Sequence, residues 1–228
     1  MKLLCFHCAG GSSSMFKRWK MNGVEVISID LPGRGKKGNL PLVDNFNEAT
    51  ESLIAQVEET IQDGEPWGVF GHSMGALFAY EITRRLMDHD PLFRVLSGVN
   101  PLQEYNGTVQ ITTGDNHTLM EKMGALGGIP DHLQKHPMFI KWFAPILRAD
   151  LSLVGTFTLN KESLPLPTYV INGTEDRIID IEKIHLWKEC MDLPVTIKAI
   201  KGDHFQILKH PEVIHSLLLK YVQVGAIY

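Results

Sequence analysis

The sequence predicts an α/β fold, with a mostly parallel sheet and helices on both of its faces. Short apolar, β-branched runs alternate along the chain with longer segments in which apolar residues recur at three- and four-residue steps. Strands in such an alternation pair in parallel, because each helix returns the chain to the edge from which the previous strand started. With 44% hydrophobic and 21% charged residues, the 228-residue chain also has the composition of a globular protein and not of a disordered one.

Six strands are expected from this pattern. The first leads into Ala9-Gly10-Gly11 and the second is closed by Leu31-Pro32-Gly33, two sequences that are typical of turns. The other four are short runs rich in apolar residues. In chain order, the strands are placed at residues 3–7, 24–30, 67–71, 92–99, 167–172 and 195–200.

Helices are expected in the segments between and after these strands, at residues 46–62, 75–87, 180–190 and 211–222. The first has the clearest signal, because its apolar residues fall on one face. These residues are Phe46, Ala49, Leu53, Val57 and Ile61. The second is rich in Ala, Leu and Phe, the third follows the capping residue Asp180, and the last begins with Pro211, which suits a first turn.

One stretch interrupts the alternation. Between residues 116 and 159 there are two or three helical segments and no strand pattern. A helical insertion of this size in an α/β domain predicts a lid over the C-terminal edge of the sheet, where such sheets bind ligands. We therefore expect a single domain over residues 1–228, with a helical lid at about 116–159.

Charge and cysteine content exclude several classes of protein. A net charge of −4 and a pI of about 6.2 give no electrostatic basis for binding nucleic acid. Three cysteines do not make a disulfide framework, and no apolar run is long enough for a signal peptide or a membrane span, so we expect a cytoplasmic protein. Cys5 and Cys8 lie in and after a strand, which does not favour a redox role. His132 and His136 have no evident third ligand, so no metal site is expected.

The strongest local signal is the sequence Gly71-His72-Ser73-Met74-Gly75, which follows an apolar strand and opens a helix. This strand–turn–helix context is that of the nucleophile in the α/β-hydrolase fold, in which a strained turn exposes the serine hydroxyl. Glycines two residues on either side let the strand and the helix approach closely. We therefore predict Ser73 as a nucleophile.

A serine nucleophile needs a base, and the base needs an orienting acid. In this fold the acid and then the histidine follow the serine, each after a strand. The turns after the fifth and sixth strands contain Asp176 and His204, which we predict as acid and base. Glu175 and Asp180 remain alternatives for the acid, although Asp180 is also well placed to cap the following helix.

The negative charge that develops on the substrate oxygen needs two hydrogen-bond donors. One is expected to be the backbone N–H of Met74, directly after the nucleophile. The other is expected from the loop after the first strand, where Ala9 precedes two glycines that allow close approach of a substrate.

A series of motifs in the expected order gives nearly the whole chain a resemblance to the type II thioesterases, stand-alone α/β-hydrolases that serve nonribosomal peptide and polyketide synthases. They lie at residues 6–11 (F-P-Y-A-G-G in the family), 31–35 (L-P-G-R-G), 71–75 (G-H-S-M-G), 127–130 (G-G-x-P), 147–150 (L-R-A-D), and in the acid and histidine loops at 173–176 and 202–204. His7 and Cys8 stand where the family usually has Pro and Tyr. This difference does not affect the backbone role of Ala9, but the family pattern then does not say which side chains form the wall of the acyl pocket.

The resemblance implies Ser73, Asp176 and His204 as a catalytic triad, with backbone donors at Ala9 and Met74. It implies hydrolysis of acyl or aminoacyl thioesters on the phosphopantetheine arms of carrier proteins, to clear arms stalled with wrong acyl units. The arm belongs to the substrate, so no cofactor is implied, and the partner is a carrier domain of a synthase; we expect a monomer. A small-molecule carboxylesterase or lipase, a releasing domain of a synthase, and an inactive hydrolase-fold binding module are the alternatives, because a fold does not determine a substrate.

Two sets of residues are candidates for binding substrate or partner. Phe139 and Trp142 belong to an apolar stripe after Pro137, which either packs the lid helix or lines the acyl channel. The segment from residue 17 to residue 37 carries a net charge of +4 in a chain of net charge −4. Its cations could steer an acidic carrier domain to the mouth of the site, or form a solvated loop. They are Lys17, Arg18, Lys20, Arg34, Lys36 and Lys37.

Overall fold

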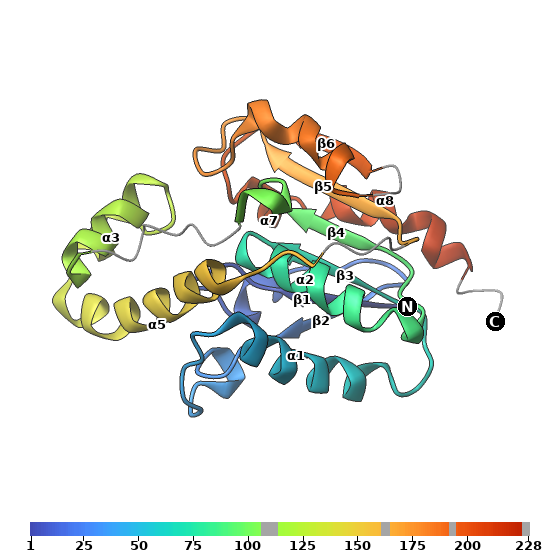
Figure 1. The fold of residues 1–228 in the computed structure, drawn as a ribbon, viewed down its shortest axis with the longest axis horizontal. Helices are drawn as coiled ribbons and strands as arrows, with labels where there is room; N and C mark the ends of the chain where they lie inside the picture. The colour runs from blue at the N-terminus through green and yellow to red at the C-terminus, as the bar shows by residue number, and fades with distance from the viewer. Residues whose placement is uncertain (106–113, 161–164, 192–194, 225–228) are drawn as a thin grey trace.

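A computed structural model of the chain describes residues 1–105, 114–160, 165–191 and 195–224 (Figure 1). Its six strands form one parallel sheet in the order β2-β1-β3-β4-β5-β6. The strands are β1 Lys2–Phe6, β2 Glu25–Ile29, β3 Trp67–His72, β4 Arg94–Ser97, β5 Thr168–Gly173 and β6 Val195–Ile200. All six predicted strands are confirmed, and none of their ends moves by more than two residues.

The side chains of each strand alternate between two hydrophobic clusters, one on each face of the sheet. On β1, Leu4 and Phe6 belong to the cluster that α1 (Phe46–Ile61) and α2 (Met74–Arg85) cover. Leu3 and Cys5 belong to the other cluster, which η1 (Ser13–Phe16) and α8 (Pro211–Val224) cover. Because both faces are covered, the four inner strands β1, β3, β4 and β5 are buried at every position, whereas the edge strands β2 and β6 are partly exposed.

Three of the four predicted helices match α1, α2 and α8 closely. The expected helix at 180–190 is instead a 3₁₀ helix, η6 Ile181–Leu186, followed by one turn of α-helix, α6 Trp187–Cys190. Ile184 and the fully buried Trp187 are three residues apart, and a turn of three residues aligns them toward the core. Asp180 caps this segment as expected, since its Oδ1 accepts from the Glu182 N–H at 3.2 Å.

The segment from residue 116 to residue 156 is helical and projects to one side of the sheet, to the left in Figure 1. It comprises α3 Asn116–Ala125, α4 Asp131–Gln134 and α5 Pro137–Thr156. The outer half of α5 packs with α3 in a hydrophobic cluster of its own, whereas Leu153, near its C-terminal end, belongs to the main core. One continuous helix therefore connects the lid to the body of the protein.

Candidate active site

Ser73 forms the whole connection between β3 and α2. Its backbone has φ 55° and ψ −119°, a conformation that costs a non-glycine residue about 1–3 kcal/mol. A Cβ atom at Gly75 would lie 2.2 Å from the carbonyl oxygen of Phe6 on β1, and one at Gly71 would lie 2.1 Å from the carbonyl oxygen of Gly75. The glycines of the motif are thus required by close backbone contacts that hold the turn, as the sequence predicted.

His204 and Asp176 lie together at the ends of β6 and β5. His204 Nδ1 donates to Asp176 Oδ2 at 2.7 Å, and the exposed fractions of the two side chains are only 3% and 1%. The other carboxylate oxygen of Asp176 accepts from the N–H groups of Ile178 and Ile179, at 2.8 and 3.2 Å. Both oxygens are therefore engaged, and the carboxylate is held in position against the imidazole.

The two alternative acids lie elsewhere. Glu175 is exposed, and Asp180 is exposed and occupied as a cap. The structure therefore brings Asp176, and neither of these, into contact with the histidine. His204 in turn lines the same cavity as Ser73.

His72, the second residue of the serine motif, packs behind the predicted base. Its ring lies 4.8 Å from the ring of His204, centroid to centroid, and its Nδ1 lies 3.2 Å from the hydroxyl of Ser97. Complete burial, with the neighbouring His204 adding to it, holds the pKa of His72 well below its ordinary value. His72 therefore remains neutral and does not compete with His204 for a proton.

The loop after β1 runs beside the serine, because β1 and β3 are neighbours in the sheet. The carbonyl of Cys8 belongs to the same peptide unit as the N–H of Ala9, the predicted donor. That carbonyl accepts from Nδ1 of His7 at 2.9 Å and from the N–H of Gly11 at 2.9 Å. Two hydrogen bonds therefore fix the orientation of the Ala9 peptide, which lines the cavity next to Ser73.

Arg34 is not a surface cation. Its exposed fraction is 3%, and its Nη2 contacts Oδ1 of Asp150, which is completely buried. The prediction that Arg34 forms part of an exposed basic rim is therefore wrong. The reason is that the L-P-G-R-G and L-R-A-D motifs, 116 residues apart at these two positions, meet in the interior.

Lys36 and Lys37 lie in η2 (Gly35–Lys37), after β2 and so at the C-terminal edge of the sheet, where Lys36 is exposed and Lys37 half-buried. The other cations follow a different course. The chain that carries Lys17, Arg18 and Lys20 returns to the opposite edge, where the amino group of Met1 donates to the carbonyl of Gly23 at 3.3 Å. Between these two points the indole N–H of Trp19 donates to the carbonyl of Leu208 at 3.1 Å, and a rim shared with Lys36 and Lys37 stays a prediction for this second group.

Two cavities meet at Ser73, and both also touch Ala9, Met123 and Ile178. The first, of about 260 Å³, extends past His204 and Phe205. The second, of about 230 Å³, extends along α2 and α5 between mostly aliphatic side chains. These are Met74, Leu77, Leu126, Leu151 and Val154.

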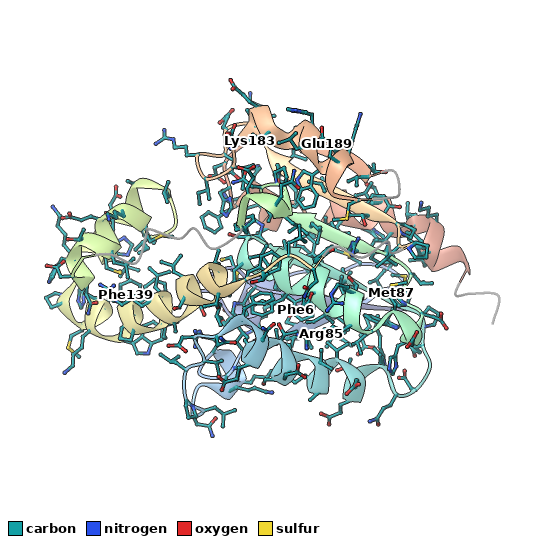
Figure 2. The ribbon with its side chains drawn as sticks, in the orientation of Figure 1. Phe6, Arg85, Met87, Phe139, Lys183 and Glu189 are labelled. Atoms are coloured by element: carbon teal, nitrogen blue, oxygen red, sulfur yellow. The ribbon has the colours of Figure 1, made fainter. Side chains whose placement is uncertain are left out.

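The apolar stripe of α5 contributes to the first cavity through Phe143 and Leu147. Neither Phe139 nor Trp142 is among the residues that line the two cavities. Phe139 stacks on Phe143 at 4.9 Å in the outer part of the lid (Figure 2), and Trp142 is 64% exposed. The residues of the stripe that line a cavity are thus Phe143 and Leu147, and Phe143 packs on the loop after β1, because a Cβ at Gly10 would lie 2.5 Å from its Cζ.

The cysteine pair has the environment of two buried thiols. Burial raises the pKa of Cys5 well above its ordinary value, and burial with the charge of Asp150 raises that of Cys8 to about 12. Both cysteines are free. Within the described part of the chain, no three His, Cys, Asp or Glu side chains gather as metal ligands would, and no helix is long and apolar enough to cross a bilayer.

Reasoning from the sequence missed three features of this site: the neutral His72 behind the base, the Arg34–Asp150 ion pair, and the role of Phe143. All of these residues lie in segments that the sequence singled out. The periodicity of the α5 stripe does not distinguish the residue that reaches the cavity from its neighbours. Nothing local to Arg34 or Asp150 indicates that the other is its partner.

Comparisons with known proteins agree with this geometry. The chain matches the thioesterase domain family over residues 1–220. It is 30% identical to the human medium-chain S-acyl fatty acid synthase thioesterase, over 99% of this chain and 89% of the relative. It is 31% identical to the probable anguibactin biosynthesis thioesterase AngT of Vibrio anguillarum, over 90% and 85%. Among solved structures, the RedJ thioesterase of the prodiginine pathway in Streptomyces coelicolor is 27% identical and superposes with a TM-score of 0.82 over 98% of this chain and 89% of that one. The fold is the α/β-hydrolase fold of these thioesterases.

The hydrogen bond between Asp176 and His204 predicts the effect of a neutral isostere. In Asp176→Asn the amide cannot accept the Nδ1 proton as the carboxylate does, so the wrong tautomer is favoured and Ser73 loses its base. We expect covalent labelling of Ser73 by a fluorophosphonate to slow on the order of 10³–10⁴-fold, as followed by gel fluorescence. Glu175→Gln, a matched change at the exposed neighbour, is expected to label like the wild type. The reverse order of effects would place the acid one residue earlier.

Proposed function

The chain belongs to the thioesterase domain family, and from this premise we propose that it hydrolyses acyl and aminoacyl thioesters on the phosphopantetheine arms of synthase carrier domains. Family membership makes it a thioester hydrolase. The names of two relatives support a carrier-bound substrate, since one is a thioesterase of fatty acid synthase and the other a thioesterase of anguibactin biosynthesis. Its role, in the manner of a type II thioesterase, is to clear arms that carry wrong acyl units.

The observation that carries the mechanism is the 2.7 Å hydrogen bond between His204 Nδ1 and Asp176, beside the cavity that Ser73 lines. With the proton held on Nδ1, Nε2 is the basic nitrogen of the ring. It takes the proton of Ser73 Oγ as that oxygen attacks the thioester carbonyl. The backbone N–H groups of Ala9 and Met74 stabilise the negative charge that develops on the carbonyl oxygen.

The carbon–sulfur bond then breaks. The pantetheine sulfur leaves with the proton from His204, and an acyl ester remains on Ser73. In the second half of the reaction, a water molecule gives a proton to His204 and its oxygen bonds to the acyl carbon. The ester bond breaks, Ser73 Oγ takes back a proton from His204, and the carboxylic acid is released.

The position of His204 assigns roles to the two cavities. The histidine protonates the leaving sulfur, so the pantetheine arm lies on its side of Ser73, in the first cavity. The acyl chain then extends away from the histidine, into the second cavity. The aliphatic side chains there, such as Leu77 and Leu151, suit a hydrocarbon chain. This cavity also determines which acyl groups are accepted.

A carrier domain approaches the C-terminal edge of the sheet, where the first cavity lies. Lys36 and Lys37 lie at this edge, in η2 after β2. We propose that they steer an acidic carrier domain by long-range attraction, without contributing to the chemical step. Arg34 has no part in docking, because it is buried.

The proposed function is tested with a phosphopantetheinylated carrier domain loaded with an acyl group. The wild-type protein is expected to release the free acid, and Ser73→Ala is expected to lose this turnover by several orders of magnitude while keeping its melting temperature. Ser52→Ala, a half-buried serine on α1, is the matched control and is expected to keep full activity. Mass spectrometry of the intact protein detects the acyl group on Ser73.

Other outcomes would each favour an alternative. Rapid hydrolysis of small carboxylic esters, with little or none of the carrier substrate, would indicate an esterase. No reaction of Ser73 with a fluorophosphonate would indicate an inactive binding module. Unchanged turnover in Ser73→Ala would exclude Ser73 as the nucleophile.

The cavity assignment predicts a change of chain-length preference. Val154 lines the second cavity only, so Val154→Phe is expected to lower kcat/KM for octanoyl-pantetheine by ~10-fold or more while largely preserving that for acetyl-pantetheine. The measurement is a series of pantetheine thioesters of increasing chain length. Thr158→Phe, at an exposed position that lines neither cavity, is the control. An equal loss at every chain length would refute the assignment.

Steering by Lys36 and Lys37 predicts an effect that depends on both substrate and salt. The double variant Lys36→Glu/Lys37→Glu is expected to raise KM for the acylated carrier domain severalfold at low salt. The effect should fade as the screening length falls to about 8 Å near physiological ionic strength. Hydrolysis of acyl-pantetheine should not change. The control, Lys188→Glu/Lys220→Glu, reverses two exposed charges on α6 and α8. Equal effects of the two double variants would exclude a docking role.

A further inference from the structure

Asp150 is a completely buried carboxylate on α5, and both of its oxygens are engaged. Oδ2 accepts from the backbone N–H of Gly10 at 2.7 Å, in the loop that carries the proposed oxyanion donor. Oδ1 is paired with Nη2 of Arg34. A charged group without solvent is stable only when it is paired and hydrogen-bonded in this way.

Arg34 is itself fixed by two further contacts. Its Nη1 donates to the carbonyl of Pro32 at 2.9 Å, and its Nη2 lies 3.4 Å from the carbonyl of Ile146 on α5. The guanidinium therefore joins the loop after β2 to the lid helix. Through Asp150, the same group of contacts reaches the loop after β1.

The hydrogen bond to Gly10 completes the immobilisation of the donor loop. The N–H of Gly10 belongs to the peptide unit that follows Ala9, while the unit that precedes Ala9 is held through the carbonyl of Cys8 by His7 and Gly11. Peptide units are planar, so fixing the units on both sides of Ala9 leaves its N–H little freedom to change direction. An oxyanion donor is effective only when its direction is set before the reaction begins.

The ion pair also controls charge. A bare carboxylate beside the oxyanion site would repel the negative charge that develops on the substrate oxygen, and the guanidinium of Arg34 offsets it. The field of Asp150 does reach this loop, since it contributes to the raised pKa of Cys8, the residue before Ala9.

We propose that the buried Arg34–Asp150 ion pair is a positioning device for the oxyanion loop: Asp150 holds the Gly10 N–H so that the Ala9 N–H faces the substrate, and Arg34 holds and neutralises Asp150. The inference rests on the proposed function in that it concerns the oxyanion of the same reaction. Arg34 and Asp150 act through the loop and do not touch the substrate themselves.

The test compares three variants with a matched control. Asp150→Asn and Arg34→Gln each break the ion pair. Arg34→Lys keeps the positive charge but replaces the two terminal nitrogens of the guanidinium by a single ammonium nitrogen. The control is Glu81→Gln, which breaks another buried ion pair, with Arg84 and Arg85, on α2 (Arg85 is labelled in Figure 2). Glu81 lies seven residues beyond Met74 along the helix, a distance of about 10 Å.

We expect Asp150→Asn and Arg34→Gln to lower kcat by ~10- to 100-fold, somewhat less than complete loss of an oxyanion donor, with little change in KM. The loss should be equal for acyl-pantetheine and for the acylated carrier domain. Arg34→Lys should retain part of the activity. Adding Asp150→Asn to Arg34→Gln should recover part of kcat, because it removes the unpaired negative charge. The melting temperature of every variant is measured beside its rate, which identifies any variant that does not fold. If Asp150→Asn or Arg34→Gln does not fold, the comparison is made with Arg34→Lys instead.

Two results would overturn the inference. If kcat in Arg34→Lys and Asp150→Asn matches that of Glu81→Gln at equal loss of melting temperature, the pair is only structural. If KM for the carrier domain rises while kcat is unchanged, Arg34 acts in docking. The rate of Ser73 labelling by a fluorophosphonate, which also forms an oxyanion, is measured in parallel. A wild type that labels but hydrolyses no thioester refutes the proposed function, while the order of labelling rates still tests the ion pair.

Discussion

The site depends on the backbone conformation of one residue, Ser73, which turns the chain from β3 into α2 without any intervening loop. This turn is possible only because Gly71 and Gly75 allow backbone atoms to approach within distances that no side chain would permit. The contact of Gly75 with the carbonyl of Phe6 also presses the start of α2 against β1. Ser73 is thereby brought beside the loop that follows β1. The cost of the strained conformation is offset by the burial of nearly all of α2 and by the hydrogen bond from the Ser73 N–H to the carbonyl of Ser97, at 2.7 Å.

Around this turn, the titratable groups are held by fixed partners. Asp176 is held by two backbone N–H groups as well as by His204, which keeps the carboxylate in place against the imidazole. His72 stays neutral because it is buried beside His204. A further buried carboxylate, Asp150, is neutralised by Arg34. The proposed mechanism develops positive charge on the histidine and negative charge on the substrate oxygen, and these fixed groups would be partners for both.

The sequence allowed most of the fold to be predicted, because strands that are covered on both faces appear as uninterrupted apolar runs bounded by turn residues. It did not distinguish a 3₁₀ from an α-helix at residues 180–190, where the 3₁₀ helix η6 leads into the single α-helical turn that begins with the buried Trp187. In the site, the order along the chain led to three residues that the structure brings together, with His204 bonded to Asp176 and lining the same cavity as Ser73, and their catalytic roles stay predictions. Arg34 was misjudged because its charge suggested a surface position. Only the three-dimensional structure brings it to Asp150, since no local pattern at either residue indicates a partner 116 residues away.

The continuity of α5 joins three parts of the site: the lid, the loop after β1 and the second cavity. Its outer half, around Phe139 and Phe143, packs within the lid, and its inner half packs on α1 and α2. Asp150 lies between these halves and is tied to the oxyanion loop. Substitutions in the outer half change the walls of the lid and of the first cavity, but they act on a helix whose base is fixed by a buried ion pair. Under the proposed cavity assignment, Leu151 and Val154, which follow Asp150 on the same helix, line the cavity for the acyl chain, so the residue proposed to hold the loop after β1 lies directly beside the residues proposed to select the substrate.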